Sequence, residues 1–363
     1  MRRLWRSVLD HVTPYEPGKP LEQLQVELGL SELIGLAANE SPLGPSPMAV
    51  DALAREARQA HLYPDGGASA LRQALARHLN LTPDWLILGN GADELLALIA
   101  WAAFEPGDDV VIPHPAFEPY RTVSTLAGAT VVRSPLVNYE IDLADVTRRV
   151  TEKTKAVILC SPHNPCGTVI RRAALAQLFD RLGEDPPLVI LDEAYIDFAD
   201  DPEAADGISF LPDHPTLLLL RTFSKIAGLA GLRVGYCVAR PAVIERLNRV
   251  RAPYNVNRLA QAAAVAALED RQHWERTRQV VRQERAFLSG ELIRRGYSVV
   301  PSQANFLLVV VPAAGAVREH LLKSGILVRD GEAVGFPDHL RITVGSRAQN
   351  QRLLDLLDQF GGR

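Results

Sequence analysis

The sequence predicts an α/β protein with a mainly parallel seven-stranded sheet flanked by helices, followed by a smaller α+β domain. Short, continuous apolar runs rich in leucine and β-branched residues recur along the chain, as in strands that are buried on both faces. Segments with helical spacing separate these runs, and this alternation is typical of α/β folds. The 363 residues are enough for two domains.

The alternation begins at residue 85. Seven strands are predicted at WLILGN, DVVIP, ATVVRSPL, KAVILCSP, PLVILDEAY, TLLLLRTFS and RVGYCVA. Helices are predicted over residues 48–59, 68–79, 92–104, 117–127, 143–150 and 171–182. The continuous apolar strands indicate a sheet that is covered by helices on both faces.

The pattern changes after the RAPYNVN segment. Helices are predicted there over residues 259–268, 274–295 and 349–360, and strands at NFLLVVV, GILVRD and LRITVG. The first residues, rich in proline and glycine, are expected to form an irregular arm against the body or a partner. We therefore expect an N-terminal arm over residues 1–45, a large domain over 46–256 and a small C-terminal domain over 257–363.

Composition narrows the function classes. The net charge of -4 and the pI near 6.2 give no electrostatic reason to expect a nucleic-acid partner. No apolar run approaches the roughly 20 residues that span a membrane, and no signal peptide is recognisable. Cys160, Cys166 and Cys237 form no CxxC pair, which argues against a disulfide framework. We expect a cytoplasmic protein without a membrane span and without a metal site.

Polar segments stand at the ends of the predicted strands, where ligands bind in open α/β sheets. GNGADE combines a tight turn with a helix start, whose amide groups can bind phosphate; an ordinary strand-to-helix turn is the alternative. Asp192 ends an apolar strand, where a carboxylate is costly unless it is paired. It is either a structural cap or ion-pair member, or the partner of a buried cation such as a protonated pyridine nitrogen.

Lys225 ends the leucine-rich strand TLLLLRTFSK in the same way. A partly desolvated lysine binds its proton less tightly, so it can form a Schiff base and act as a general base; a solvated loop lysine is the alternative. Ser224 and Arg233 supply a hydroxyl and a guanidinium suited to one phosphate. Asn164 and Tyr195 can hydrogen-bond a phenolate oxygen.

Taken together, these segments resemble one family. The chain is similar, nearly end to end, to the histidinol-phosphate aminotransferases, which are fold-type I enzymes that use pyridoxal 5′-phosphate (PLP). The shared blocks appear in family order as LAANESPLGPSP, YPDGG, GNGADEL, SPHNPCG, LDEAYIDF, RTFSKIAGLAGLRVGY, PYNVN, ANFLL, GILVRD and LRITVG. Each block alone is weak, but their combination at these spacings is specific.

The resemblance implies roles for individual residues. Lys225, Asp192 and Tyr195 are expected to be catalytic, with Lys225 holding PLP as a Schiff base and Asp192 facing the pyridine nitrogen. The implied cofactor-binding residues are Ala92, Asp93, Phe117, Asn164, Asp192, Tyr195, Ser224, Lys225, Arg233 and Tyr63. The implied substrate-binding residues are Tyr15, Asn39, Arg329 and Arg341. The pattern of LRITVG by itself favours a surface strand arginine at position 341, and only the resemblance implies a substrate-binding role. Tyr63 is expected to reach the cofactor phosphate of a neighbouring subunit, which implies a homodimer with shared active sites.

The implied reaction is the ping-pong conversion of histidinol phosphate and 2-oxoglutarate to imidazole acetol phosphate and glutamate, a step of histidine biosynthesis. An aromatic amino acid aminotransferase of the same subfamily is the nearest alternative, and a decarboxylase of a phosphorylated amino acid is a more distant one. A non-catalytic relative would be expected to lack Lys225 or Asp192. Cys166, Ser41 and Phe117 depart from common family residues, and none of them removes a catalytic group.

Overall fold

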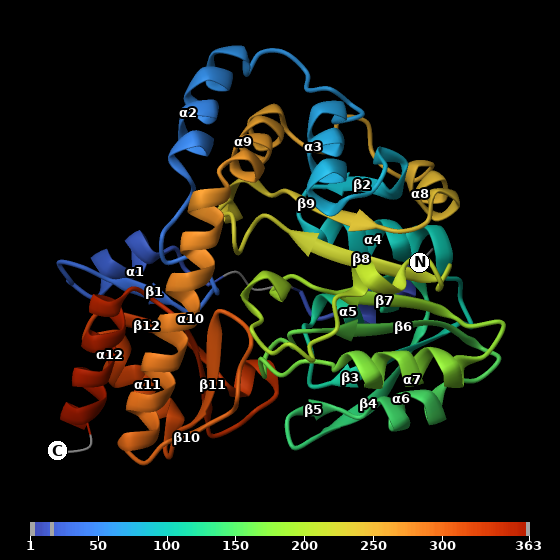
Figure 1. Cartoon of the computed structure of the whole chain (residues 1–363). Helices are drawn as coiled ribbons and strands as arrows, with labels where there is room; N and C mark the ends of the chain where they lie inside the picture. Colours follow the sequence, from blue (N-terminus) through green and yellow to red (C-terminus); the bar gives the residue numbers. More distant parts are fainter. Residues whose placement is uncertain (1–3, 15–17, 361–363) are drawn as a thin grey trace.

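A computed structural model describes residues 4–14 and 18–360 of the chain, and two β-sheets organise it (Figure 1). The large sheet has the strand order β2-β9-β8-β7-β6-β3-β4-β5. Its strands are β2 (Leu86–Gly89), β3 (Asp109–His114), β4 (Thr130–Val137), β5 (Glu140–Ile141), β6 (Thr154–Cys160), β7 (Leu188–Asp192), β8 (Leu217–Thr222) and β9 (Gly235–Val238). β4, β3, β6, β7 and β8 pair in parallel, so the predicted α/β class with a mainly parallel sheet is confirmed.

Seven of these strands are the predicted ones, and the eighth corrects the predicted number. β5 has two residues and pairs antiparallel with β4 across a turn at Asn138 and Tyr139, which both have positive φ. A two-residue turn of this kind usually contains glycine. Because the turn carries Tyr139 instead and the strand is so short, no sequence signal marks it.

Helices cover both faces of the large sheet (Figure 1). Along β8, Leu217 and Leu219 join one buried cluster, whereas Leu218 and Leu220 join the cluster on the opposite face. The first face is covered by α3 (Ser69–Leu79), α6 (Leu143–Arg149), α7 (Arg172–Leu182) and α9 (Arg258–Glu269), and the second by α4 (Ala92–Ala103), α5 (Pro119–Ala127) and α8 (Pro241–Asn248). Successive leucines are therefore buried on alternate faces, which explains why the strand is continuously apolar.

The second β-sheet is smaller and has the strand order β1-β12-β13-β11-β10. Its strands are β1 (Ile34–Leu36), β10 (Ser298–Val299), β11 (Phe306–Val310), β12 (Ile326–Asp330) and β13 (His339–Thr343). Apolar side chains from α10 (Arg271–Arg294), α11 (Ala314–Lys323) and α12 (Arg347–Phe360) pack with this sheet in one buried cluster. Of these helices, α11 was not among the sequence predictions, and neither was α8 beside the large sheet.

The N-terminal arm is more regular than predicted. It contains α1 (Leu21–Glu27), and β1 pairs in parallel with β12, more than 280 residues further along the chain. A strand of three residues is too short to show an alternation of apolar and polar side chains. β1 is therefore defined by its backbone hydrogen bonds to the edge strand β12. The arm is thereby built into the small sheet.

The segment between the two sheets contains α9 and α10. α2 (Pro47–Glu56) and α9 lie side by side at the top of Figure 1. Buried alanines on one face of α9, such as Ala260 and Ala264, join the core of the large sheet. The long helix α10 then runs down to the small sheet (Figure 1). None of the helices in the described part of the chain is long and apolar enough to cross a membrane.

A buried ion pair braces the end of β8 against β7. The Arg221 guanidinium lies 2.8 Å from the Glu193 carboxylate and 2.7 Å from Asp206, while the amide of Gly207 donates to Glu193 at 2.7 Å. Glu193 is 1% exposed, so its charge depends on these donors. This network lies next to Asp192 in the chain and holds the end of its strand.

We expect Arg221→Met to lower the free energy of unfolding by about 3–5 kcal/mol, because Glu193 would keep a buried charge without its cation. Urea unfolding followed by circular dichroism would measure the change. Arg249→Met is the matched control, since Arg249 pairs with Glu245 on the exposed face of α8, and we expect a loss below about 0.5 kcal/mol. Equal losses in the two variants would contradict this account of Arg221.

Candidate active site

A cavity of about 300 Å³ lies where β6, β7 and β8 end, with Cys160, Asp192 and Thr222 in its wall. Eleven of the fourteen predicted site residues line it, namely Asn39, Ala92, Asp93, Phe117, Asn164, Asp192, Tyr195, Ser224, Lys225, Arg233 and Arg341. Parallel neighbours end at one edge of a sheet, and this geometry brings residues from distant parts of the chain together.

One end of the cavity suits an anion. The helix α4 begins there at Ala92 and Asp93, and a helix N-terminus presents amide groups to a ligand. Arg233 lies against this turn, with its Nη2 atom 3.2 Å from Asp93 Oδ2. Gly91 has φ of +82°, and a Cβ at this position would lie 2.5 Å from the Arg233 guanidinium. Glycine therefore permits the arginine to approach the start of the helix.

The carboxylate of Asp192 occupies the deep wall. Its Oδ2 atom accepts a 2.6 Å hydrogen bond from the Tyr120 hydroxyl, and its Oδ1 atom accepts one from the amide of Ala194 at 3.0 Å. Burial raises the pKa of Asp192 to about 6, although both hydrogen bonds act in the opposite direction. A cation placed beside this carboxylate would stabilise its charged form.

Tyr120 was missed by the sequence predictions although it also lines the cavity. It lies in α5, three residues after Phe117, and the two rings meet edge to face at 5.5 Å. Burial, followed by the charge of Asp192, raises the pKa of Tyr120, so its phenol stays protonated and donates to the carboxylate. The HPAFEPY segment contained this tyrosine, but no spacing rule connects a helix residue to the end of β7.

Lys225 follows β8 and is half-buried in the cavity. Its Nζ atom donates to the carbonyl of Ala38 at 2.9 Å and lies 5.8 Å from the centre of the Tyr195 ring. Burial and then the nearby charge of Arg341 lower the pKa of Lys225 to about 8. A substantial fraction of this amine is therefore neutral near pH 8, as a nucleophilic lysine requires.

Tyr195 is held by residues of the small sheet and the arm. Asn39 Nδ2 donates to the Tyr195 hydroxyl at 3.1 Å, and Thr343 of β13 donates to Asn39 Oδ1 at 3.2 Å. The amide of Asn39 donates back to Thr343 Oγ1 at 3.0 Å. Burial raises the pKa of Tyr195 to about 12, so this phenol is also a donor. Asn39, predicted as a substrate-binding residue, thus has a direct contact to Tyr195.

Arg341 closes the other end of the cavity from β13. Its Nη1 donates to Asn164 Oδ1 at 2.7 Å and its Nη2 to the Ala37 carbonyl at 2.8 Å. The buried Nε has no hydrogen-bond partner among the described residues. Burial lowers the pKa of Arg341 to about 10, because the guanidinium lacks a paired anion. This end of the cavity therefore suits an acidic ligand.

Three predicted residues are not placed in the cavity wall. Arg329 of β12 is exposed, pairs in register with Arg341, and its charge helps to lower the pKa of that arginine. Tyr63 is not among the residues that line the cavity; it is 78% exposed and stacks on Tyr254 with ring centres 4.7 Å apart. Tyr15 lies outside the described residues.

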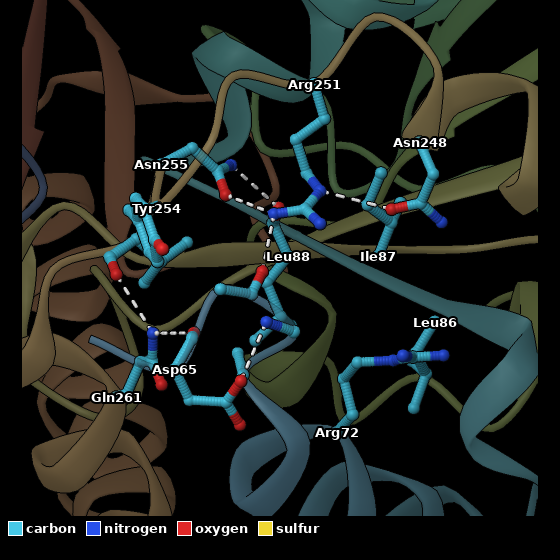
Figure 2. A pocket seen from close by; sticks show the side chains of 14 residues that line it. Asp65, Arg72, Leu86, Ile87, Leu88, Asn248, Arg251, Tyr254, Asn255 and Gln261 are labelled. Atoms are coloured by element: carbon cyan, nitrogen blue, oxygen red, sulfur yellow. Dashed lines mark hydrogen bonds between the residues drawn. The ribbon is translucent and has the colours of Figure 1, made fainter. Parts of the chain in front are cut away.

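The turn that follows Tyr63 is held firmly. Figure 2 shows the narrow pocket beside it, where Arg251 donates to the Gly66 carbonyl at 2.8 Å and Gln261 donates to the Asp65 carbonyl at 3.0 Å. The Tyr63 carbonyl accepts a 3.0 Å hydrogen bond from Arg258. An exposed aromatic residue on such an ordered backbone presents a defined surface.

The model of the "Aminotransferase class I and II" family matches residues 31–357. The chain belongs to this family. Curated histidinol-phosphate aminotransferases of Symbiobacterium thermophilum and Moorella thermoacetica are 46% and 41% identical to it. These alignments cover 97% and 98% of this chain, and 97% and 92% of the two relatives. The histidinol-phosphate aminotransferase of Sinorhizobium meliloti, solved in complex with PLP, superposes with a TM-score of 0.89 at 27% identity, covering 99% of this chain and 98% of the other. The predicted family is confirmed.

Proposed function

We propose that the chain is a PLP-dependent transaminase that interconverts histidinol phosphate and 2-oxoglutarate with imidazole acetol phosphate and glutamate. One observation carries the transaminase part, namely that Lys225 and Asp192 line one cavity together with two guanidinium groups, Arg233 and Arg341. The relatives named above, which are similar over nearly the whole chain, support the choice of substrate.

The donor set of the cavity fits PLP group by group. The start of α4 with Ser224 and Arg233 matches the phosphate, and Asp192 matches the pyridine nitrogen. Tyr195 and Asn164 match the phenolic oxygen. Burial raises the pKa of Asp192, so a cationic group beside this carboxylate would be favoured, as a protonated pyridine nitrogen requires.

When bound, PLP supplies a conjugated ring that accepts the electron pair left when a substrate carbon loses its proton. Lys225 would hold the cofactor through its neutral amine and, when free, would be the base that moves the proton of the reacting substrate carbon. Asp192 would keep the ring nitrogen protonated, and Tyr195 would donate to the phenolic oxygen. Arg341 binds the acidic group of either substrate in turn, which a ping-pong reaction requires.

Two arginines on adjacent strands suit this pair of substrates. Histidinol phosphate carries a phosphate, whereas 2-oxoglutarate carries two carboxylates, and a guanidinium binds both kinds of oxyanion bidentately. Arg341 lies in the cavity, and Arg329 lies beside it at the exposed side. We infer that Arg341 and Arg329 together bind the phosphate of histidinol phosphate, which is the only acidic group of that substrate. With 2-oxoglutarate, Arg341 binds the carboxylate next to the reacting carbon and Arg329 meets the distal carboxylate.

A substrate panel tests the proposal. Purified protein with PLP is given histidinol phosphate, phenylalanine, tyrosine or aspartate as donor and 2-oxoglutarate as acceptor. We expect kcat/KM for histidinol phosphate to exceed that for phenylalanine by about 100-fold or more. The single carboxylate of phenylalanine can bind Arg341 but leaves Arg329 without an anion. A preference for phenylalanine would replace the proposed substrate by the aromatic alternative, and activity with none would refute the transaminase.

We also infer that the protein is cytoplasmic and that it forms a homodimer in which the two chains share residues of each active site. The support is the exposed Tyr63 on its ordered turn, near further exposed apolar residues such as Leu62 and Tyr254. Tyr63 lies outside the cavity of its own chain, so a second copy is needed for it to reach a cofactor phosphate.

Mixed dimers test the sharing of sites. Lys225→Ala chains should be inactive, and Tyr63→Ala chains should lose about tenfold or more in activity at limiting PLP, because a charge-assisted hydrogen bond is lost. A dimer of one chain of each kind has one complete site, since intact Lys225 and Tyr63 come from different copies. Co-refolded mixtures should therefore exceed the summed activity of the two variants. A merely additive mixture would show that Tyr63 is not shared.

The charge state of Asp192 predicts how the cofactor-free protein responds to pH. Because its pKa is about 6 in the fold and its ordinary value is 3.8, the folded state keeps a proton that the unfolded chain has released. The stability that this proton contributes is present below about pH 4 and is lost as pH rises through about 6. Relative to the wild type, Asp192→Asn should gain up to about 3 kcal/mol between pH 4 and pH 7, measured by thermal unfolding. A pH-independent difference between the two proteins would contradict this.

A further inference from the structure

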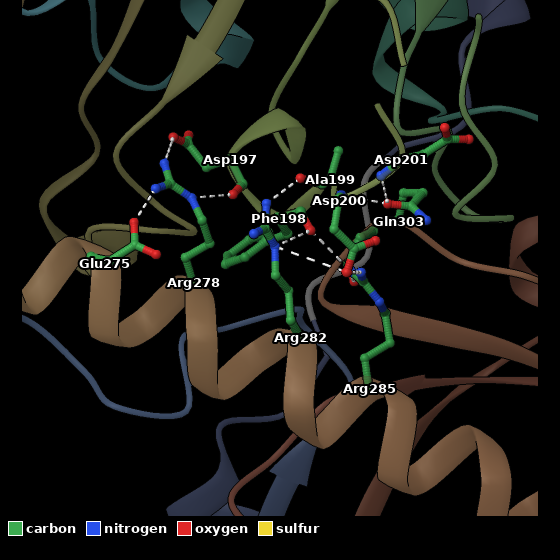
Figure 3. Close-up of polar contacts among 11 residues, drawn as sticks. Asp197, Phe198, Ala199, Asp200, Asp201, Glu275, Arg278, Arg282, Arg285 and Gln303 are labelled. Carbon is green, nitrogen blue, oxygen red and sulfur yellow. Dashed lines mark hydrogen bonds and ion pairs between the residues drawn. The ribbon is translucent and has the colours of Figure 1, made fainter. Parts of the chain in front are cut away.

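Three arginines project from one side of α10 toward the segment that follows Tyr195 (Figure 3). Arg278, Arg282 and Arg285 are spaced four and three residues apart, which places them on one helix face. Arg278 Nε donates to the Asp197 carbonyl at 2.9 Å, and Arg282 donates to the Ala199 carbonyl. Apart from the ion pair of Arg278 with Glu275 in the same helix, the hydrogen bonds and ion pairs of these two arginines within the described part of the chain all go to residues 197–200.

Arg285 differs because it joins two segments. It is 6% exposed, and its Nη1 atom donates to the Phe198 carbonyl at 3.1 Å and to the Ala304 carbonyl at 3.0 Å. Its Nη2 atom lies 2.9 Å from Asp200 Oδ2. Burial of a guanidinium is costly unless its donors are satisfied, so these acceptors fix its position. A nearby side chain reinforces the same junction, since Gln303 accepts from the amide of Asp200 at 2.7 Å.

The two joined segments lead to two different residues of the active site. Phe198 ends a short 3-10 turn, Ile196–Phe198, that starts directly after Tyr195. Ala304 precedes β11, which pairs with β13, and Leu308 of β11 lies opposite Arg341. Arg285 thus holds the loop that follows Tyr195 and also the segment that leads into β11, the strand beside Arg341.

The side chains between these loops are packed together. Tyr195, Phe198, Ala304 and Phe306 belong to one buried cluster. The Tyr195 ring meets the Phe306 ring edge to face at 5.2 Å, and the Arg341 guanidinium lies 5.4 Å from the centre of the same Phe306 ring. A shift of either loop would be transmitted through Phe306, because packed interiors have little free volume.

We propose that Arg285 is a positioning residue that sets the Tyr195 hydroxyl and the Arg341 guanidinium relative to each other, and so aligns the bound cofactor with the acidic group of the substrate. This inference rests on the proposed function. Arg285 touches neither cofactor nor substrate, and it acts through Phe198 and Ala304.

The test compares Arg285→Met and Arg285→Lys with Arg278→Met in the PLP-loaded protein. Arg278 is the matched control, since it is an α10 arginine that contacts the same loop but not the segment before β11. Three quantities are measured for each variant, namely the melting temperature, the pH midpoint of the absorbance change of PLP bound to Lys225, and kcat and KM for 2-oxoglutarate.

We expect Arg285→Met to raise the pH midpoint by about one unit, because a displaced Tyr195 no longer favours the deprotonated nitrogen of Lys225, and to raise KM for 2-oxoglutarate about tenfold. Arg285→Lys keeps the charge with fewer directed donors and should show smaller shifts of both. Arg278→Met should leave both near the wild-type values, even if its melting temperature falls. The charged groups that act on Lys225, which are Arg341, Glu40, Arg233, Asp93 and Asp192, stay the same in every variant.

A lower melting temperature with an unchanged midpoint and KM in both Arg285 variants would overturn the proposal and leave a structural role only. If Arg285→Met does not fold, Arg285→Lys decides alone, since unchanged values in it would count equally against positioning. If the wild-type protein showed no pH-dependent band of bound PLP, the proposed function itself would have failed.

Discussion

Replacing Lys225 by alanine should abolish transamination, with a loss of at least about 10⁴-fold in kcat, and should remove the absorbance band of PLP attached to the protein. The size follows from two separate losses. Alanine offers no amine to attach the cofactor, and no other base near the reacting carbon can carry the proton. Among the described residues of the wall, the phenols of Tyr120 and Tyr195 and the thiol of Cys160 all have raised pKa values, so they stay protonated. The carboxylate of Asp93 pairs with Arg233, and that of Asp192 accepts from Tyr120.

Turnover would be measured by glutamate formation, and cofactor attachment by absorbance before and after borohydride reduction. Lys155→Ala is the control, because Lys155 lies at the start of β6 in a loose 3.9 Å pair with Asp108 and outside the cavity. It should retain both properties. Should Lys225→Ala keep the absorbance band and its turnover, another residue would have to be the attachment point.

The cavity residues that could be predicted from the sequence lie at the ends of buried strands or in recognisable motifs. Asp192 and Lys225 each end an apolar run, and parallel neighbouring strands end at the same edge. The position of Asp192 and Lys225 at the ends of buried strands could therefore be predicted from local patterns, and so could the start of α4. Motif spacing added Asn164 and Arg233.

What the sequence could not reveal depends on contacts between distant elements. The hydrogen bond from Tyr120 to Asp192 needs the packing angle of α5 on the sheet. The contact of Asn39 with Thr343 joins residues 304 positions apart. Likewise, β1 becomes a strand only when β12 is in place. No periodicity within a single segment contains this information, so these features required the folded chain.

Three ionisable groups of the cavity have shifted pKa values that share one physical cause. Asp192 has a raised pKa, whereas Lys225 and Arg341 have lowered ones, and burial is the first cause in all three cases. Burial thus destabilises the charged form of each of the three groups. A ligand that brings a cation to Asp192 and an anion to Arg341, and that uses the neutral amine of Lys225, relieves all three at once.

This reasoning leads to the second large effect. Asp192→Asn should lower kcat by about 10²- to 10³-fold, the typical cost of losing one preorganised electrostatic contact, while PLP still binds through its phosphate. Asparagine has nearly the shape of aspartate but no charge, so it cannot keep the ring nitrogen protonated. The ring then accepts the electron pair of the substrate carbon less readily.

Tyr120→Phe separates the charge of Asp192 from its orientation. This variant removes the 2.6 Å hydrogen bond to Asp192 but leaves the carboxylate charged, so we expect a loss of only about tenfold in kcat. Single-turnover kinetics with each amino donor would measure the chemical step directly, and equilibrium dialysis would confirm that PLP remains bound. If Asp192→Asn turned over like the wild type while Tyr120→Phe did not, the charge at this position would be irrelevant and the hydroxyl of Tyr120 would be the catalytic contact.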